Sequence, residues 1–221
     1  LVASLVSLVI AASAGAVRLR VATLGDSGTD EYYGTVGATF FGDKDIPAMN
    51  WMEQLADDRG AYLDFGRLES DPTVRGEPRN DGYSRNWARN GAAAVGRGWA
   101  VEPFSSQVAG AAAQIASGDV DFAYIMIGGN DFSLREFVGL SFDRDDPGYQ
   151  VFAQAVFDAI FGAVDTLEAA GTAPIAVGWF LVGGEIFWPS FSLNLRIMSE
   201  ARDRRVPYIN LFDFLTLGTT E

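Results

Sequence analysis

The 221-residue sequence contains no histidine and no cysteine. Without cysteine there is no disulfide, no thiolate metal site and no cysteine nucleophile. The lack of histidine removes the other common zinc ligand. It also excludes a chymotrypsin-like protease, which needs a histidine upstream of its Gly-Asp-Ser-Gly sequence on an all-β scaffold. We therefore expect neither a zinc site nor a thiolate metal site.

Basic residues are also scarce, with 16 Lys and Arg against 29 Asp and Glu, for a formal net charge of −13. Such an acidic surface repels the phosphate backbone of nucleic acids and anionic lipids, so nucleic acid is not an expected partner. Hydrophobic residues make up 48% of the chain and charged residues 20%. This composition is typical of a globular protein, and the length suits one sizeable α/β domain.

The first sixteen residues, 1–16, are apolar and then small. They resemble the apolar region and cleavage site of a secretory signal peptide, and both Ala12-Ser13-Ala14 and Ala14-Gly15-Ala16 fit the small-x-small rule. The run is shorter than the roughly 20 apolar residues of a membrane-spanning helix. We therefore predict a signal-peptide remnant and an exported protein without stable membrane insertion; a buried N-terminal helix is the alternative.

From residue 17 onward, short apolar runs alternate with segments of helical spacing, and no repeat or linker interrupts them. The apolar runs predict strands over 17–24, 61–65, 120–127, 174–182 and 206–211. The spacing predicts a helix beginning at Asn50 and helices over 107–117, 151–170 and 194–205, with loops over 32–47 and 69–83. Alternating strands and helices favour a single α/β domain over 17–221, with a mainly parallel sheet covered by helices on both faces.

Three polar motifs follow predicted strand ends: Gly25-Asp26-Ser27, Asn90-Gly91 and Gly128-Gly129-Asn130-Asp131. In a parallel sheet such ends converge on one crevice. Acyl transfer needs a nucleophile and hydrogen-bond donors for the developing oxyanion. Ser27 offers the hydroxyl and its own N–H, Gly91 lets a backbone N–H approach closely, and Asn130 offers a carboxamide donor.

In this order the motifs resemble the blocks of the GDSL, or SGNH, hydrolase family, the second block being the run from Asn86 to Ala92. The resemblance implies a three-layer α/β/α sandwich of the flavodoxin-like type. It also implies hydrolysis of a small-molecule carboxylic ester through an acyl-enzyme on Ser27, without a metal ion or other cofactor, and with an oxyanion hole formed by Ser27, Gly91 and Asn130.

The last family block, Asp-x-x-His near the C-terminus, is not matched, because Thr216 stands in the histidine position of Asp213-Phe214-Leu215-Thr216. We interpret the hydrolase domain over 17–221 as incomplete at its C-terminal end, and we expect these residues alone to be nearly inactive. A secreted, non-catalytic binding domain on the same fold and a carbohydrate O-deacetylase are the alternatives.

The remaining candidates have weaker signals. Asp26 and Asp131 are expected to support the site by bracing its turns rather than by performing chemistry. The segment 143–148 superficially resembles a calcium loop, but Pro147 occupies a ligand position and Gln154 replaces the bidentate glutamate. Four tryptophans are candidates for lining a sugar or acyl cleft, although core packing is their usual role: Trp87, Trp99, Trp179 and Trp188.

Overall fold

A computed structural model gives the arrangement of most of the chain. The residues that it describes are 18–30, 50–69, 82–89, 91–96, 103–132, 145–171, 173–179 and 187–210. The predicted signal peptide, the predicted loop over 32–47 and the segment 213–216 lie outside these ranges.

Five strands form one parallel sheet in the order β2-β1-β5-β6-β7. Their bounds are Leu19–Gly25 for β1, Leu63–Asp64 for β2, Phe122–Met126 for β5, Ile175–Trp179 for β6 and Tyr208–Asn210 for β7. The second strand in sequence lies on one side of β1 and the later three lie on the other side, which is the flavodoxin-like order. The predicted parallel sheet is therefore confirmed, and its topological switch point lies between β1 and β5.

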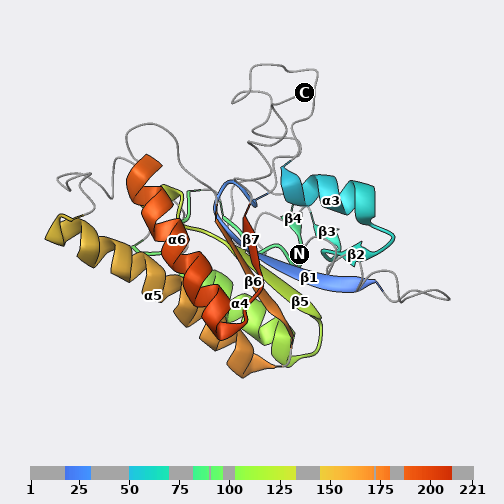
Figure 1. Cartoon of the computed structure of the whole chain (residues 1–221). Coiled ribbons are helices and arrows are strands. Elements are labelled where there is room, and N and C mark those ends of the chain that lie inside the picture. Colours follow the sequence, from blue (N-terminus) through green and yellow to red (C-terminus); the bar gives the residue numbers. More distant parts are fainter. Residues whose placement is uncertain are drawn as a thin grey trace, which may run out of the picture.

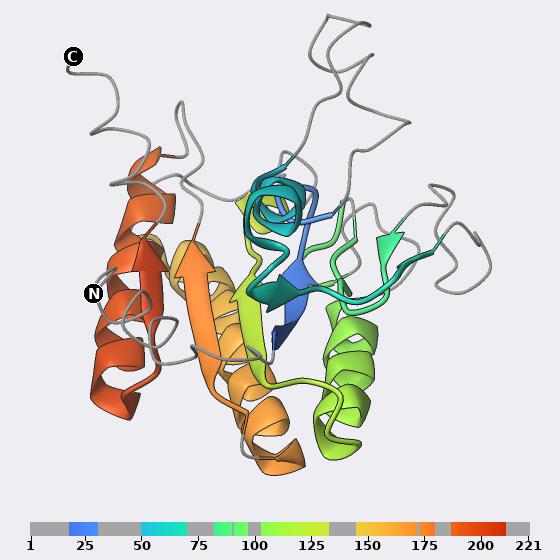
Figure 2. The same ribbon diagram turned by 90° about the vertical axis from the view of Figure 1, so that its right-hand side faces the viewer.

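Helices cover both faces of the sheet (Figures 1 and 2). Three of them, α4 (Phe104–Ala116), α5 (Pro147–Ala170) and α6 (Phe187–Arg204), pack on one face, and α3 (Trp51–Arg59) packs on the other. The predicted three-layer arrangement is thus confirmed. No helix within the described ranges is both long enough and apolar enough to cross a bilayer.

Side-chain alternation along the strands builds the two interfaces. In β1, Ala22 and Leu24 join the large core under α4, α5 and α6, whereas Val21 packs with Met52 of α3 on the other face. Successive side chains of a strand point to opposite faces, so a strand that is covered on both sides must be apolar throughout. This explains why β5 reads as a nearly continuous hydrophobic run.

The observed helices begin earlier than the apolar spacing indicates. The α5 helix starts at Pro147 rather than at residue 151, because the Asp146 side chain accepts hydrogen bonds from the N–H groups of Gly148 and Tyr149. Likewise α4 starts at Phe104 and α6 at Phe187. By contrast, α3 begins where the sequence predicts, because Asn50 and Glu53 form a capping box with hydrogen bonds of 2.8 and 2.9 Å.

The predicted loop over 69–83 is wrong at its two ends. Strands β3 (Leu68–Glu69) and β4 (Gly82–Tyr83) pair antiparallel there and form a small separate sheet. Two-residue strands give too little period-2 alternation to be recognised among glycines and prolines.

Helix α5 supplies a direct test of the core. Leu167 of this helix is fully buried, whereas Val151 on the same helix is 73% exposed. We expect Leu167→Ala to lower the free energy of unfolding by about 3 kcal/mol, because it removes buried apolar surface and leaves a cavity. Val151→Ala is the matched control and should change it by less than about 0.5 kcal/mol. Urea unfolding of both variants measures the difference, and equal effects would contradict this packing.

Candidate active site

Ser27 lies in a tight turn that follows the end of β1. The N–H groups of Thr29 and Asp30 both donate to the carbonyl of Asp26, at 3.0 and 2.9 Å, and so close one turn over 26–30. The N–H of Gly28 donates to the Asp26 carboxyl at 2.9 Å. This turn holds the half-buried Ser27 at the carboxyl edge of the sheet.

The turn begins at Gly25, where the backbones of β1 and β5 are tightly packed. A Cβ added to Gly25 would lie 2.3 Å from the carbonyl oxygen of Met126, so only glycine fits. Gly25 and Met126 are also partners in the register, which means that both strands end at the same level. Beyond the strands, the N–H of Gly129 donates to the Asp26 carboxyl and joins the two loops.

The second block runs beside the end of β1, where Asn86 forms a parallel bridge with Thr23. The buried Asn86 side chain donates to the carbonyl of Thr29 at 2.9 Å. Its amide oxygen accepts from the Thr23 hydroxyl at 2.7 Å and from the N–H of Ala88 at 3.1 Å. Asn86 therefore fastens the serine turn to the second block.

Gly91 follows in the left-handed region, with φ of +78°, a conformation that favours glycine. Two residues before it, the N–H of Arg89 donates to the carbonyl of Gly25 at 3.1 Å, and the carbonyl of Arg89 accepts from the N–H of Ala92 at 3.0 Å. The hydrogen bond between Arg89 and Gly25 thus fixes the position of the backbone that leads into Gly91. Asn90 lies outside the described residues.

The third block follows β5 and begins the short 3-10 helix η1 (Asn130–Phe132). The Asn130 side-chain amide donates to the carbonyl of Ala92 at 2.9 Å. The Asp131 carboxylate accepts from the N–H groups of Ala94 and Val95 at 2.7 and 2.8 Å. Two adjacent side chains of this block therefore hold the loop that carries Gly91.

The structure brings the loops of Ser27, Gly91 and Asn130 to one edge of the sheet, at the switch point between β1 and β5. Sequence reasoning did not assign a role to Asn86, although it lies inside the quoted second block. It also treated Gln107 only as a helix residue. No local pattern marks either side chain, because each binds residues far away in the sequence: Asn86 binds Thr23 and Thr29, and Gln107 binds the backbone of Gly25.

Two carboxyl groups lie at this edge, of which Asp131 is fully buried and Asp26 is half-buried. Burial raises the pKa of Asp26 to about 6, although hydrogen bonds from the N–H groups of Gly28 and Gly129 lower it. Burial also raises the pKa of Asp131 to about 7, and the nearby charge of Asp26 adds to the rise. The pair therefore takes up protons close to neutral pH.

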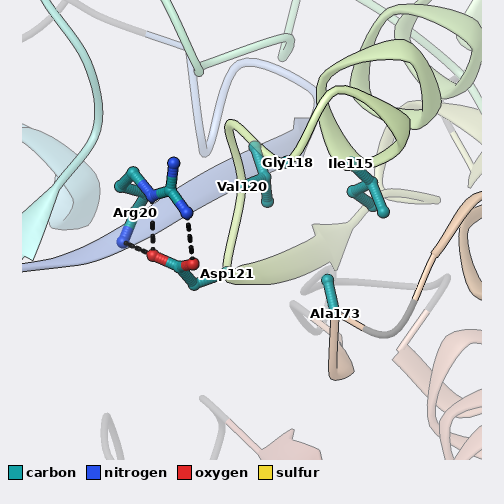
Figure 3. A pocket seen from close by; sticks show the side chains of 6 residues that line it. All are labelled: Arg20, Ile115, Gly118, Val120, Asp121 and Ala173. Carbon is teal, nitrogen blue, oxygen red and sulfur yellow. Dashed lines mark hydrogen bonds and ion pairs between the residues drawn. The ribbon is translucent and has the colours of Figure 1, made fainter.

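A cavity of about 250 Å³ lies at the opposite end of the strands (Figure 3). Its polar wall is the ion pair of Arg20 and Asp121, joined by hydrogen bonds of 2.8 and 2.6 Å, which lowers the pKa of Asp121. Because Arg20 belongs to the start of β1, this cavity is separate from the Ser27 edge.

The weaker sequence candidates resolve as follows. Within the described ranges, no group of three acidic side chains could hold a metal ion. In the segment that resembles a calcium loop, Asp146 caps α5, and 143–144 lie outside those ranges. Trp87 packs against Gly110 of α4 and donates to Gln114 at 2.8 Å, which is a core role. The side chains of the other three candidate tryptophans, at positions 99, 179 and 188, are outside the description.

No protein-family model and no curated protein matches the sequence. Similar solved structures include a GDSL-like lipase from Bacteroides thetaiotaomicron, 14% identical, with 95% of this chain and 78% of that chain covered and a TM-score of 0.48. A family 3 carbohydrate esterase from Clostridium thermocellum is also 14% identical, with 89% and 80% covered and a TM-score of 0.47. A psychrotrophic esterase from Pseudoalteromonas is 14% identical, with 88% and 79% covered and a TM-score of 0.44.

The carboxyl pair predicts how stability depends on pH. In the unfolded chain both groups have a pKa near 3.8, whereas the folded values are about 6 and 7. The folded state therefore binds more protons between pH 4 and pH 7. Because of this linkage, the free energy of unfolding should fall as the pH rises across that window, since each unit of pKa shift is equivalent to about 1.4 kcal/mol.

Urea unfolding at pH 5 and pH 8 measures this fall. Asp131→Asn cannot ionise, so its difference between the two pH values should be clearly smaller than that of the parent. Asp57→Asn, on the exposed side of α3, is the control and should keep the parental difference. A parent that is more stable at pH 8 than at pH 5 would contradict the prediction.

Proposed function

We propose that this protein is an ester hydrolase of the GDSL type that forms an acyl-enzyme on Ser27. One observation carries the proposal: the loop of Asn130 is fastened to the loop of Gly91 and to the turn of Ser27, all at the switch point of the sheet. A nucleophile and two oxyanion donors from distant parts of the sequence then share one edge, where open α/β sheets bind their ligands.

In the proposed reaction the Ser27 hydroxyl oxygen attacks the ester carbonyl carbon, and its proton passes to a base. The oxyanion of the tetrahedral intermediate accepts hydrogen bonds from the N–H groups of Ser27 and Gly91 and from the Asn130 amide. One N–H of that amide is bound to Ala92, which orients the group and leaves its second N–H for the substrate. The intermediate expels the alcohol, and water then releases the acid from Ser27.

The base is not a histidine of these 221 residues, because they contain none. We therefore propose that the 221-residue chain binds and orients the ester but reacts slowly, since nucleophile and base act as a unit. Added imidazole supplies the missing proton acceptor in solution. This makes the assignment of Ser27 testable in the chain as it stands.

The first test is the hydrolysis of p-nitrophenyl acetate by the parent and by Ser27→Ala, with and without imidazole. We expect slow hydrolysis by the parent, a clear acceleration by imidazole above the reaction of imidazole alone, and neither effect in Ser27→Ala. Mass spectrometry should find the acetyl group on Ser27. Equal rates for the two proteins under both conditions would rule out the mechanism and favour a binding domain.

The second test concerns the oxyanion donors. Asn130→Ala should lower the Ser27-dependent rate by a factor of about 10²–10³, the usual effect of losing one such donor. Because Asn130 also contacts Ala92, Asn130→Asp is the companion variant: it keeps the shape and removes the N–H donors. Both variants should be checked for folding by circular dichroism. A well-folded Asn130→Asp with the parental rate would remove Asn130 from the oxyanion hole.

We further propose that the protein is exported, on the basis of the apolar and small residues in 1–16. N-terminal sequencing of the protein recovered from outside the cytoplasm should find Gly15 or Val17 as the first residue, after cleavage at one of the two small-x-small sites. A mature chain that still contains residues 1–12 would contradict the proposal.

A further inference from the structure

Gln107 is a buried residue in the first turns of α4, and both ends of its side-chain amide bind the backbone of Gly25. Its amide oxygen accepts from the N–H of Gly25 at 2.9 Å, and its amide nitrogen donates to the carbonyl of the same residue at 3.0 Å. This pairing is the one that a neighbouring strand would make. Gln107 thus takes the place of a strand partner where β1 ends.

The carbonyl of Gly25 is shared with a second donor. It also accepts from the N–H of Arg89 at 3.1 Å. Ser27 lies two residues after Gly25 and Gly91 lies two residues after Arg89, so this carbonyl joins the nucleophile turn to the path of the oxyanion donor. A side chain that fixes the Gly25 backbone therefore fixes the spacing between them.

We propose that Gln107 is a positioning residue for ester hydrolysis. Its two hydrogen bonds to the Gly25 backbone hold the Ser27 hydroxyl at the correct distance from the N–H donor of Gly91. This inference rests on the proposed function. Gln107 touches neither the substrate nor the reacting atoms, and it acts through the backbone alone. The role needs one acceptor and one donor on a neutral, buried group, which a glutamine amide provides.

That requirement gives a chemical signature. A glutamate at position 107 can reproduce both hydrogen bonds only while it is protonated, because an ionised carboxylate has no donor for the Gly25 carbonyl. Burial raises the pKa of a carboxyl group, so the variant should change from competent to impaired within an accessible pH range. Methionine has a similar length and shape but makes neither strong hydrogen bond, so it should be impaired at every pH.

The experiment measures covalent labelling of Ser27 by a fluorophosphonate in the 221-residue chain with a fixed concentration of imidazole, from pH 5 to pH 9. The serine oxygen bonds to phosphorus, fluoride leaves and the proton passes to imidazole. Each variant rate is divided by the parental rate at the same pH, so that the ionisation of imidazole, Asp26 and Asp131 cancels. Intact mass reports the labelled fraction and the rate.

For Gln107→Glu we expect a ratio near one at pH 5 that falls about tenfold by pH 9, and for Gln107→Met a ratio about tenfold below one throughout. The tenfold loss should appear in the maximal labelling rate. The fluorophosphonate concentration that gives the half-maximal rate and the final labelled fraction should both stay at the parental values. Lower final labelling at an unchanged rate would instead mean partial unfolding and would overturn the proposal. So would a Gln107→Glu ratio that does not vary with pH.

The matched control is Gln114→Glu on the same helix. The Gln114 amide accepts from the indole N–H of Trp87 at 2.8 Å and donates to the carbonyl of Ser84 at 2.9 Å, so it makes the same kind of bridge but not to Gly25. Its labelling should follow the parental pH profile. A fall equal to that of Gln107→Glu would show a general effect of a new charge on α4 and would overturn the proposal.

A readout without chemistry separates this inference from the proposed function. Amide hydrogen exchange of Gly25, measured by NMR, should be slow in the parent and at least tenfold faster in Gln107→Met, which removes the acceptor of the Gly25 N–H, whereas the carboxylate of Gln107→Glu keeps that acceptor and should leave the exchange slow. A parent that fails to label on Ser27, with this exchange pattern present, would refute the proposed function and leave the grip on Gly25 intact. Unchanged exchange in Gln107→Met would refute the grip itself.

Discussion

The backbone of Gly25 is the point at which the elements around the candidate site meet. Its missing side chain lets β1 approach Met126 of β5, its N–H and carbonyl bind Gln107 of α4, and its carbonyl also binds Arg89 of the second block. A strand, a helix and a loop therefore all contact the backbone of Gly25, two residues before Ser27. A shift of this peptide would move the serine turn relative to both neighbouring loops.

Polar side chains around Gly25 hold the neighbouring loops in place through further hydrogen bonds. Asn86 binds the carbonyl of Thr29, and Asn130 and Asp131 bind the backbone of the loop after Gly91. Buried polar groups are costly when unpaired, at about 1–3 kcal/mol each, so breaking any of these contacts would destabilise the fold. The spacing of the site is thus maintained by the same hydrogen bonds that stabilise the fold.

The sequence predicted the elements whose structure is determined by residues close together in the chain. A few neighbouring residues were enough to predict three features. These are the apolar strand that ends at residue 127, the helix that begins at Asn50, and the polar residues after β1 and β5. The early start of α5 was missed because its cap, Asp146, lies in an acidic segment that resembles a loop. Gln107 was missed for a different reason. Its partner is 82 residues away, and a glutamine in an alanine-rich helix gives no sign that its amide pairs with a strand.

The carboxyl groups of Asp26 and Asp131 impose an electrostatic constraint on the proposed chemistry. Together they take four backbone N–H groups, from Gly28, Gly129, Ala94 and Val95, and those donors are then unavailable to a substrate. An ionised pair would also oppose the formation of an oxyanion nearby, since charges interact strongly where water is excluded. Their pKa values of about 6 and 7 mean that the pair retains a proton for part of the time near neutral pH. In the proposed reaction, raising the pH therefore has two opposed effects: it frees the base to accept the serine proton, and it adds negative charge beneath the oxyanion.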